Sequence, residues 1–203
     1  DERFVDALGL KLNIEVFIQS FDTKNYAKEH KLSIQVAARA LRYQWFKELR
    51  EQLHFDYILT AHHADDNLET FLINLSRGTG IEGLTGIPEV NDTIVRPLLP
   101  FTRQELINYA KEACINWRED ASNAETKYLR NKLRHEVIPV LKGINPQLIQ
   151  NFQKTLQHLQ ESQSIINDRI DGVSDKVLAV EKDSIRLDIE ELKKLNNPKA
   201  YLY

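Results

Sequence analysis

The chain has 203 residues, is 42% hydrophobic and 28% charged, and carries a net charge of −3, values typical of a globular domain with room for a small second one. The slight acidic excess argues against a uniformly basic nucleic-acid-binding protein and leaves a local basic patch open. No apolar run approaches 18 residues, so no membrane span is predicted. A single cysteine, Cys114, excludes an internal disulfide and indicates a reducing, cytoplasmic location.

The first half of the chain alternates helical and strand patterns. Helical spacing of apolar residues predicts helices over residues 1–13, 25–53 and 65–77. Short apolar runs predict strands over residues 14–20, 55–61 and 93–99. Residues 78–88 hold four of the seven glycines and predict a loop. This alternation predicts an α/β fold, with a parallel twisted sheet and helices on both faces.

The second half is helical in character. Thr102 precedes Glu105 by three residues, which predicts a capping box at a helix start. Residues 124–141 predict a basic helix that ends near Pro139, and Asn145–Pro146 predicts the start of a long amphipathic helix. A short strand and a last helix are predicted within residues 183–195. We therefore expect an α/β domain over residues 1–120 and a smaller helical region over residues 121–203.

Histidines and carboxylates crowd the stretch "YILTAHHADDNLETF", residues 57–71. The stretch follows a predicted strand and opens a helix, which is where open α/β sheets bind ligands. On a helix that starts near Ala64, Asp66 and Glu69 share one face, and His62 lies at the strand-to-helix corner. Three interpretations stay open: an acidic helix start stabilised by the helix dipole, a nucleotide or substrate site, and a metallohydrolase site.

Arginines occur in two helically spaced pairs. Arg39 and Arg42 are three residues apart, and Arg130 and Arg134 are four apart, so each pair can grip a phosphate or a carboxylate. Residues 126–142 contain five basic residues and one acidic residue, and this local excess indicates a polyanionic partner. The alternative for any one of these arginines is a solvated surface position. The glycine-rich loop is a weak phosphate-binding signal, because it follows a helix and lacks the lysine of a P-loop.

A series of segments resembles the tRNA(Ile)-lysidine synthases. In chain order they are "FDT", "AARALRYQWF", "TAHHADDNLETFLINLSRGTGIEGLTGIP", "RPLL", "WREDASN" and "YLRNKLRHEVIPVL". The 2-thiocytidine synthases belong to the same N-type ATP pyrophosphatase superfamily, but they depend on paired cysteines that this chain lacks. The resemblance implies an adenine-nucleotide alpha hydrolase-like PP-loop domain over residues 1–120 and a helical substrate- and tRNA-side region with a linker over residues 121–203.

The resemblance also implies an ATP-dependent carbon–nitrogen ligase. Such an enzyme adenylates C2 of the wobble cytidine in an isoleucine tRNA with a CAU anticodon and releases pyrophosphate. Free L-lysine then displaces AMP. ATP is used as its Mg²⁺ complex, with no standing metal site and no membrane partner, and a homodimer is one assembly that the resemblance allows. Two alternatives remain: another PP-loop ATP pyrophosphatase that modifies tRNA, and a non-catalytic tRNA-binding fragment.

Roles for individual residues follow from the resemblance alone. Asp66, Glu69 and Arg134 match residues that bind lysine, and Asp66 and Arg134 are also implied in catalysis together with His62. The residues implied in binding ATP or tRNA are Arg39, Arg42, His62 and Arg130. Asp65 and Tyr128 are further candidates.

One defining motif is missing. The family's "SGGxDS" loop, which cradles pyrophosphate and holds an aspartate for Mg²⁺, does not occur in the sequence, and neither does any methionine. We therefore expect a fragment that is incomplete at its N-terminus, with the loop upstream of Asp1, and that lacks the tRNA-acceptor-binding region beyond Tyr203. The 203 residues alone are predicted to be inactive.

Overall fold

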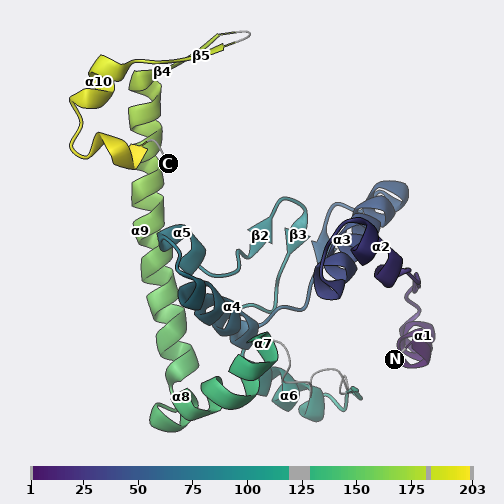
Figure 1. Ribbon diagram of the computed structural model, residues 1–203. Helices are drawn as coiled ribbons and strands as arrows, with labels where there is room; N and C mark the ends of the chain where they lie inside the picture. The colour runs from purple at the N-terminus through teal and green to yellow at the C-terminus, as the bar shows by residue number, and fades with distance from the viewer. Residues whose placement is uncertain (1, 119–128, 182–183, 202–203) are drawn as a thin grey trace. The chain divides into compact units, whose positions relative to one another are not determined.

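The computed structural model describes residues 2–118, 129–181 and 184–201 (Figure 1). The chain divides into two units: the first comprises residues 1–63 and 89–123, and the second comprises residues 64–88 and 124–203. Residues 64–88 therefore belong with the C-terminal helices, although a strand of the first unit comes shortly before them.

Helices dominate the first unit. They are α1 (Glu2–Leu12), α2 (Thr23–Glu29), α3 (Ile34–Leu53) and α6 (Arg103–Glu112). At the start of α3, Ser33 Oγ accepts from the backbone N–H of Val36 at 3.3 Å, which satisfies one of the unpaired donors of the first turn. The predicted capping box of α6 is confirmed, because Thr102 and Glu105 accept from each other's backbone N–H groups.

The sheet of the first unit is small and mixed. It has the order β1 (Ile58–Leu59), β3 (Ile94–Val95), β2 (Val90–Asn91). β1 and β3 are parallel, with Ile58 opposite Ile94, whereas β2 and β3 are antiparallel. Asp92 makes the tight turn between β2 and β3 in the left-handed conformation, with φ of 54°. The predicted parallel pairing is confirmed for β1 and β3, but the sheet is mixed, because β2 and β3 form a hairpin that was not recognised from the sequence.

The strand predicted over residues 14–20 does not form. A strand needs a neighbour to pair its backbone N–H and C=O groups, and within the described residues no strand pairs with this segment. Its apolar side chains lie largely in solvent: Ile14 is 61% exposed and Ile18 is 51% exposed. The apolar composition of the segment predicted a strand, but composition does not show whether a neighbouring strand is available to pair with it.

The second unit is built around α4 (Ala64–Arg77), α8 (Ile138–Ile144) and α9 (Leu148–Val177). Figure 1 shows α4 beside the N-terminal half of α9. The buried residues where α4, α8 and α9 meet are Ala64, Leu68, Ile138, Ile149, Phe152 and Leu156. Phe71 packs edge-on against Phe152, with ring centroids 5.3 Å apart. Leu75, in contrast, is 53% exposed, so the predicted buried face of α4 ends at Leu72.

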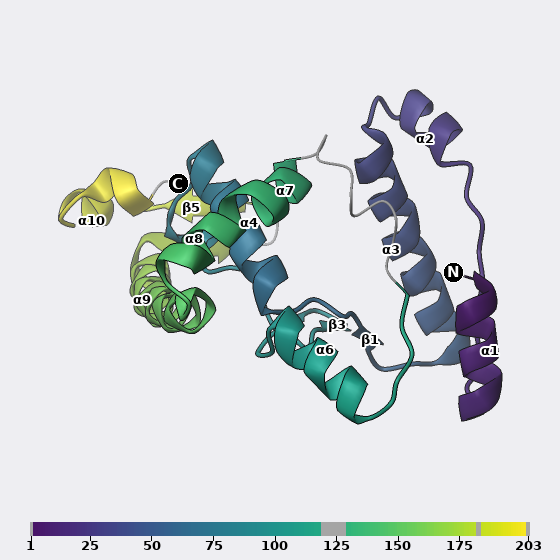
Figure 2. The same ribbon diagram turned by 90° about the horizontal axis from the view of Figure 1, so that it is seen from below.

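In the second unit, α7 (Leu129–Lys132) leads into a π-helical turn, η2 (Leu133–Val137), and then into α8. Figure 2 shows this continuous helical path beside α4. Pro139 was predicted to end the helix, but the helix continues to Ile144. Proline cannot donate to the carbonyl of His135 and would collide with it in an α-helix. The chain instead closes a wider turn, in which Ile138 N–H bonds Leu133 O.

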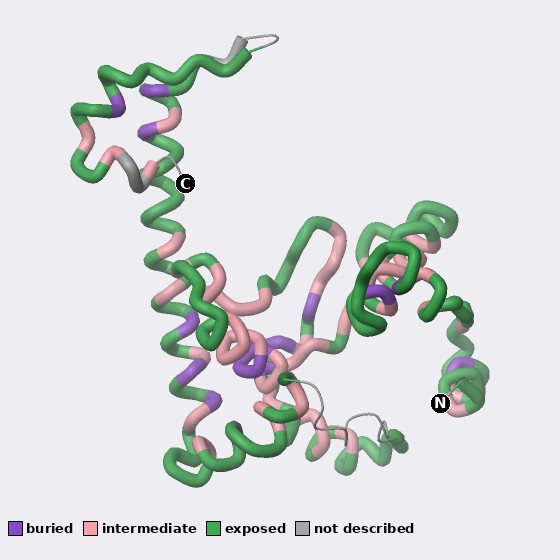
Figure 3. Tube along the Cα trace, in the orientation of Figure 1, coloured by how far each residue is buried: buried purple, intermediate pink, exposed green. Residues whose placement is uncertain are grey.

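The far end of α9 carries a second, separate core. Val173 and Val177 of α9 pack with Leu192 of α10 (Ile189–Lys193). The hairpin of β4 (Leu178–Glu181) and β5 (Ser184–Leu187) and the 3-10 turn η3 (Pro198–Tyr201) complete this end. Figure 3 shows the buried positions of α9 in two groups, one beside α4 and one beside α10. The strand and helix predicted within residues 183–195 are confirmed as β5 and α10.

Candidate functional site

The first turns of α4 carry the carboxylates of the candidate site. Asp65 and Asp66 lie in the first turn, where the helix dipole favours negative charge. Glu69 follows Asp66 by three residues and therefore shares its face, while Leu68 and Phe71 face the core. The interpretation as an acidic helix start is correct for the position of the aspartates. It does not account for what their side chains contact.

Glu69 is the most deeply buried of these carboxylates, with its side chain 1% exposed. Arg134 of η2 donates Nε to Glu69 Oε1 at 2.6 Å and Nη2 to Glu69 Oε2 at 2.9 Å. This is the parallel two-bond geometry that guanidinium and carboxylate groups favour. Arg134 Nη2 also lies 3.1 Å from Asp66 Oδ1, so one guanidinium joins both predicted lysine-binding acids.

Arg130, one helical turn before Arg134, reaches the same carboxylate. Its Nε lies 3.6 Å from Glu69 Oε2, and its Nη2 donates to Thr70 Oγ1 at 2.8 Å. The predicted pairing of Arg130 with Arg134 on one helical face is therefore confirmed by their common partner. Thr70 was not predicted to belong to the site. Its position directly after Glu69 was the one sequence feature that pointed to it.

Asp65 has a different partner. Lys142 of α8 places Nζ 2.7 Å from Asp65 Oδ1, with the lysine side chain 42% exposed and the aspartate side chain 13% exposed. The two residues are far apart in sequence, and nothing in the spacing of Lys142 predicted the contact. This ion pair ties the start of α4 to α8.

The network as a whole is electrically balanced. Three carboxylates, of Asp65, Asp66 and Glu69, face three cationic side chains. The pKa of Arg134 is raised above its ordinary value, chiefly by the hydrogen bond to Glu69 and further by the charges of the three carboxylates, against the opposing effect of burial. Arg134 is therefore a permanent positive charge at this site.

The other predicted residues belong to the first unit. The ring Nδ1 of His62 lies 3.0 Å from Thr60 Oγ1, and the ring is half-buried. Arg39 and Arg42 are exposed on α3, and the guanidinium of Arg39 stacks over the Tyr43 ring at 4.7 Å. Asp66, Glu69, Arg130 and Arg134 are thus brought together in the second unit, while Arg39, Arg42 and His62 are residues of the first. Tyr128 lies outside the described residues, as does most of the segment "WREDASN".

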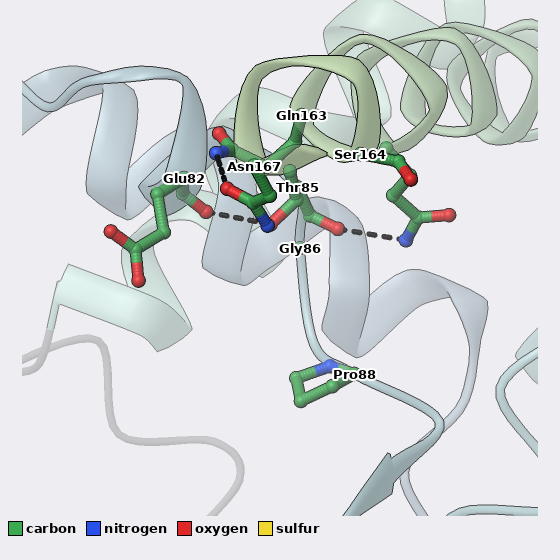
Figure 4. Close-up of a pocket in the computed structure, with 8 residues that line it drawn as sticks. Glu82, Thr85, Gly86, Pro88, Gln163, Ser164 and Asn167 are labelled. Carbon is green, nitrogen blue, oxygen red and sulfur yellow. Dashed lines mark hydrogen bonds between the residues drawn. The ribbon is translucent and has the colours of Figure 1, made fainter. Parts of the chain in front are cut away.

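Three amide side chains fix the glycine-rich segment that follows α4. Asn67 Oδ1 accepts from Ile87 N–H at 2.7 Å, Asn74 Nδ2 donates to Gly83 O at 2.8 Å, and Gln160 Nε2 donates to Thr85 O at 3.0 Å. The segment, predicted as a loop, contains the short helix α5 (Ile81–Leu84). A pocket of about 460 Å³ lies between α5 and α9 (Figure 4). The three amide contacts hold the glycine-rich segment against α4 and α9.

Within residues 2–118, 129–181 and 184–201, no group of three or more His, Cys, Asp and Glu side chains has an arrangement that could hold a metal ion. No helix in the same ranges is long and apolar enough to cross a membrane.

Comparison with known proteins agrees with the resemblance seen in the sequence. The chain is 41% identical to a tRNA(Ile)-lysidine synthase of Porphyromonas gingivalis over its whole length, which covers 44% of that relative. It is 42% identical to one of Bacteroides thetaiotaomicron, over 93% of the chain and 44% of the relative. For one of Bacillus subtilis the identity is 34%, over 98% of the chain and 43% of the relative. The chain thus spans less than half the length of these relatives.

A family model provides an independent match. It is described as the PP-loop domain and covers residues 1–141, which include α4, the two arginines and the whole carboxylate cluster. The chain therefore belongs to the PP-loop domain family.

Proposed function

We propose that the protein containing this chain is a tRNA(Ile)-lysidine synthase. The observation that carries the proposal is the joint contact of Arg134 with Asp66 and Glu69, in a PP-loop chain that resembles lysidine synthases along its whole length. The reaction is the ATP-dependent ligation of lysine to C2 of the wobble cytidine in isoleucine tRNA with a CAU anticodon. Residues 1–120 form part of an adenine-nucleotide alpha hydrolase-like domain, and residues 121–203 lie on the tRNA side.

The charges of the site suit a zwitterionic amino acid. The Asp66 side chain is 15% exposed and offers a carboxylate to an ammonium group of lysine. Arg134 is 24% exposed and supplies a permanent positive charge for the lysine carboxylate. Buried Glu69 adds negative charge beneath both and fixes the orientation of Arg134. A lysine amine that has lost its proton then attacks C2 of the adenylated cytidine. The C2–N bond forms, the C2–O bond breaks, AMP leaves with that electron pair, and the attacking nitrogen releases a proton to solvent.

We further propose that the phosphates of ATP or tRNA are bound by His62, Arg39, Arg42 and Arg130. His62 lies in the segment between β1 and α4, two residues before α4 begins at Ala64. The arginines supply permanent charge suited to phosphate oxygens. ATP is taken as its Mg²⁺ complex, but the carboxylates of Asp65, Asp66 and Glu69 do not fit Mg²⁺, because each faces a basic side chain. No step is assigned to the metal.

The test uses the full-length gene product that contains this chain. ATP, Mg²⁺, labelled lysine and a CAU-anticodon isoleucine tRNA transcript are mixed, and lysine bound covalently to tRNA is counted. Asp66→Ala is expected to abolish attachment. Asp168→Ala, which removes an exposed carboxylate on α9, is expected to have no effect.

The result also separates the alternatives. Nucleotide-dependent tRNA modification that does not require lysine would favour another PP-loop tRNA-modifying ATP pyrophosphatase. Bound tRNA without any modification would favour a non-catalytic tRNA-binding role. Attachment that persists in Asp66→Ala would remove the proposed role of this residue.

A further inference from the structure

The hydroxyl group of Thr70 contacts both the backbone of α4 and the side chain of Arg130. Its Oγ1 donates to the backbone carbonyl of Asp66 at 2.9 Å, one turn earlier in α4, and accepts Nη2 of Arg130 at 2.8 Å. A threonine hydroxyl can donate one hydrogen bond, and here it donates to the carbonyl of Asp66. An oxygen lone pair of Thr70 therefore faces the guanidinium. Thr70 therefore presents a fixed acceptor to Arg130.

Arg130 is held along one edge. Thr70 binds Nη2, and the carboxylate of Glu69 lies 3.6 Å from Nε. Within the described ranges 2–118, 129–181 and 184–201, Nη1 makes no hydrogen bond or ion pair, and the side chain is 41% exposed. The guanidinium is thus oriented by α4, while its opposite edge meets no partner in the described part of the chain.

The hydrogen bond from Arg130 to Thr70 has a physical reason. Arg134 already satisfies both oxygens of Glu69 at 2.6 and 2.9 Å, so Glu69 alone holds Arg130 weakly at its longer distance. An arginine side chain also loses much rotamer entropy when it is fixed. Thr70 Oγ1 is a neutral acceptor whose own position is fixed by its bond to the helix backbone. It therefore orients Arg130 without adding a charge to the network.

We propose that Thr70 is a positioning residue, which orients Arg130 so that the open edge of the guanidinium binds a phosphate group of a substrate. The identity of that substrate rests on the proposed function, in which phosphate is carried by ATP and by tRNA. Guanidinium binds phosphate oxygens through two parallel N–H bonds, which requires a defined orientation.

Equilibrium binding to the full-length gene product tests this. Dissociation constants for ATP, tRNA and lysine are measured separately for wild type, Thr70→Val, Thr70→Ser, Arg130→Met and the double variant Thr70→Val/Arg130→Met. We expect Thr70→Val to weaken binding of one phosphate-bearing ligand about 5-fold, as for the loss of one hydrogen bond. The double variant should bind like Arg130→Met, Thr70→Ser like wild type, and lysine binding should not change. The ligand whose dissociation constant rises, ATP or tRNA, carries the phosphate group that Arg130 binds.

Thr155→Val is the matched control. Thr155 Oγ1 also donates to a carbonyl one turn earlier, that of Asn151 at 3.0 Å, but it is exposed on α9. Its replacement removes the same backbone contact and is expected to leave every dissociation constant unchanged.

The outcomes distinguish the inference from the proposed function. Equal weakening by Thr70→Val with and without the Arg130 guanidinium would overturn the inference, as would unchanged binding of both phosphate ligands. Lysine attachment by wild type, assayed in parallel, tests the proposed function. Coupled effects of Thr70 and Arg130 without any lysine attachment would reject the proposed function and retain the inference.

Discussion

Glu69 and Arg134 form a two-bond ion pair, although they lie on separate helical segments 65 residues apart in the chain. Nε and Nη2 of the arginine meet the two carboxylate oxygens, and the glutamate side chain is buried. Such a pair is costly to break from one side, because the remaining charge stays desolvated. The contact therefore fixes the position of η2 on α4 as well as the charges of the site.

Glu69→Gln should lower the stability of the chain. The amide keeps the shape but leaves the Arg134 guanidinium without its counter-charge, at a cost of about 2 kcal/mol, since Arg134 is partly solvated. The melting temperature should fall by about 5 °C. Glu190→Gln is the control, because Glu190 is 80% exposed in its pair with Lys193 and should cost less than about 0.5 kcal/mol. Similar shifts in the two variants would contradict the assigned strength of the buried pair.

The contribution of Arg134 should not depend on pH between 7 and 10. Its pKa is raised in the folded chain, so the associated stability is complete below the unfolded value and is lost only as pH rises through the higher folded value. The difference in unfolding free energy between wild type and Arg134→Met should therefore be the same at pH 7 and pH 10, measured by denaturant titration. A difference that shrinks across this window would show that the charge of Arg134 is lost within it.

Asp65 and Lys142 should couple modestly. A double-mutant cycle with Asp65→Asn and Lys142→Met should give an interaction free energy of about 0.5–1 kcal/mol, because solvent screens a lysine that is 42% exposed. The same cycle on Lys47 and Glu51, which are 4.0 Å apart and more exposed, provides the comparison and should give a smaller value. Equal values would mean that partial burial of Asp65 adds nothing.

Gly86→Ala should destabilise the chain more than Gly78→Ala. Both glycines have positive φ, 79° and 74°, so both variants incur about 1–2 kcal/mol of backbone strain. An added Cβ at Gly86 would also collide with Asn67 Oδ1 and crowd Leu156, whereas at Gly78 it would meet no atom within 4 Å among the described residues. We expect an additional cost of about 1–3 kcal/mol for Gly86→Ala, measured by thermal melting. Equal losses would show that the loop shifts to relieve the collision.

Local sequence signals predicted the helices and the face of α4 that carries the acids. The capping box of Thr102 and Glu105 and the spacing of Asp66 and Glu69 depend on residues within one turn, and such patterns can be read directly. The long helix α9 was also predicted, but its start was placed too early: Asn145 accepts from Gln147 N–H before the helix begins at Leu148.

Long-range pairing was not predictable from the same patterns. The partner of Asp65 is Lys142, 77 residues away, and the segment of residues 14–20 had the composition of a strand but no neighbour to pair with. The π-turn that carries Arg134 depends on how the helix accommodates Pro139 against α4, which a rule that proline ends helices does not anticipate. The pattern gave candidate residues, whereas their partners depend on the packing of α4, η2 and α8.

The length of α9 has a mechanical consequence. Between Leu156 in one core and Val173 in the other, about 25 Å of helix has no buried residue. Near Gln160 this stretch is also held by the side-chain bond to Thr85 O, whereas fraying between Asn167 and Val173 would break backbone hydrogen bonds without exposing a buried side chain. The end that holds β4, β5 and α10 therefore has a core of its own, separated along α9 from the core beside the charged cluster on α4.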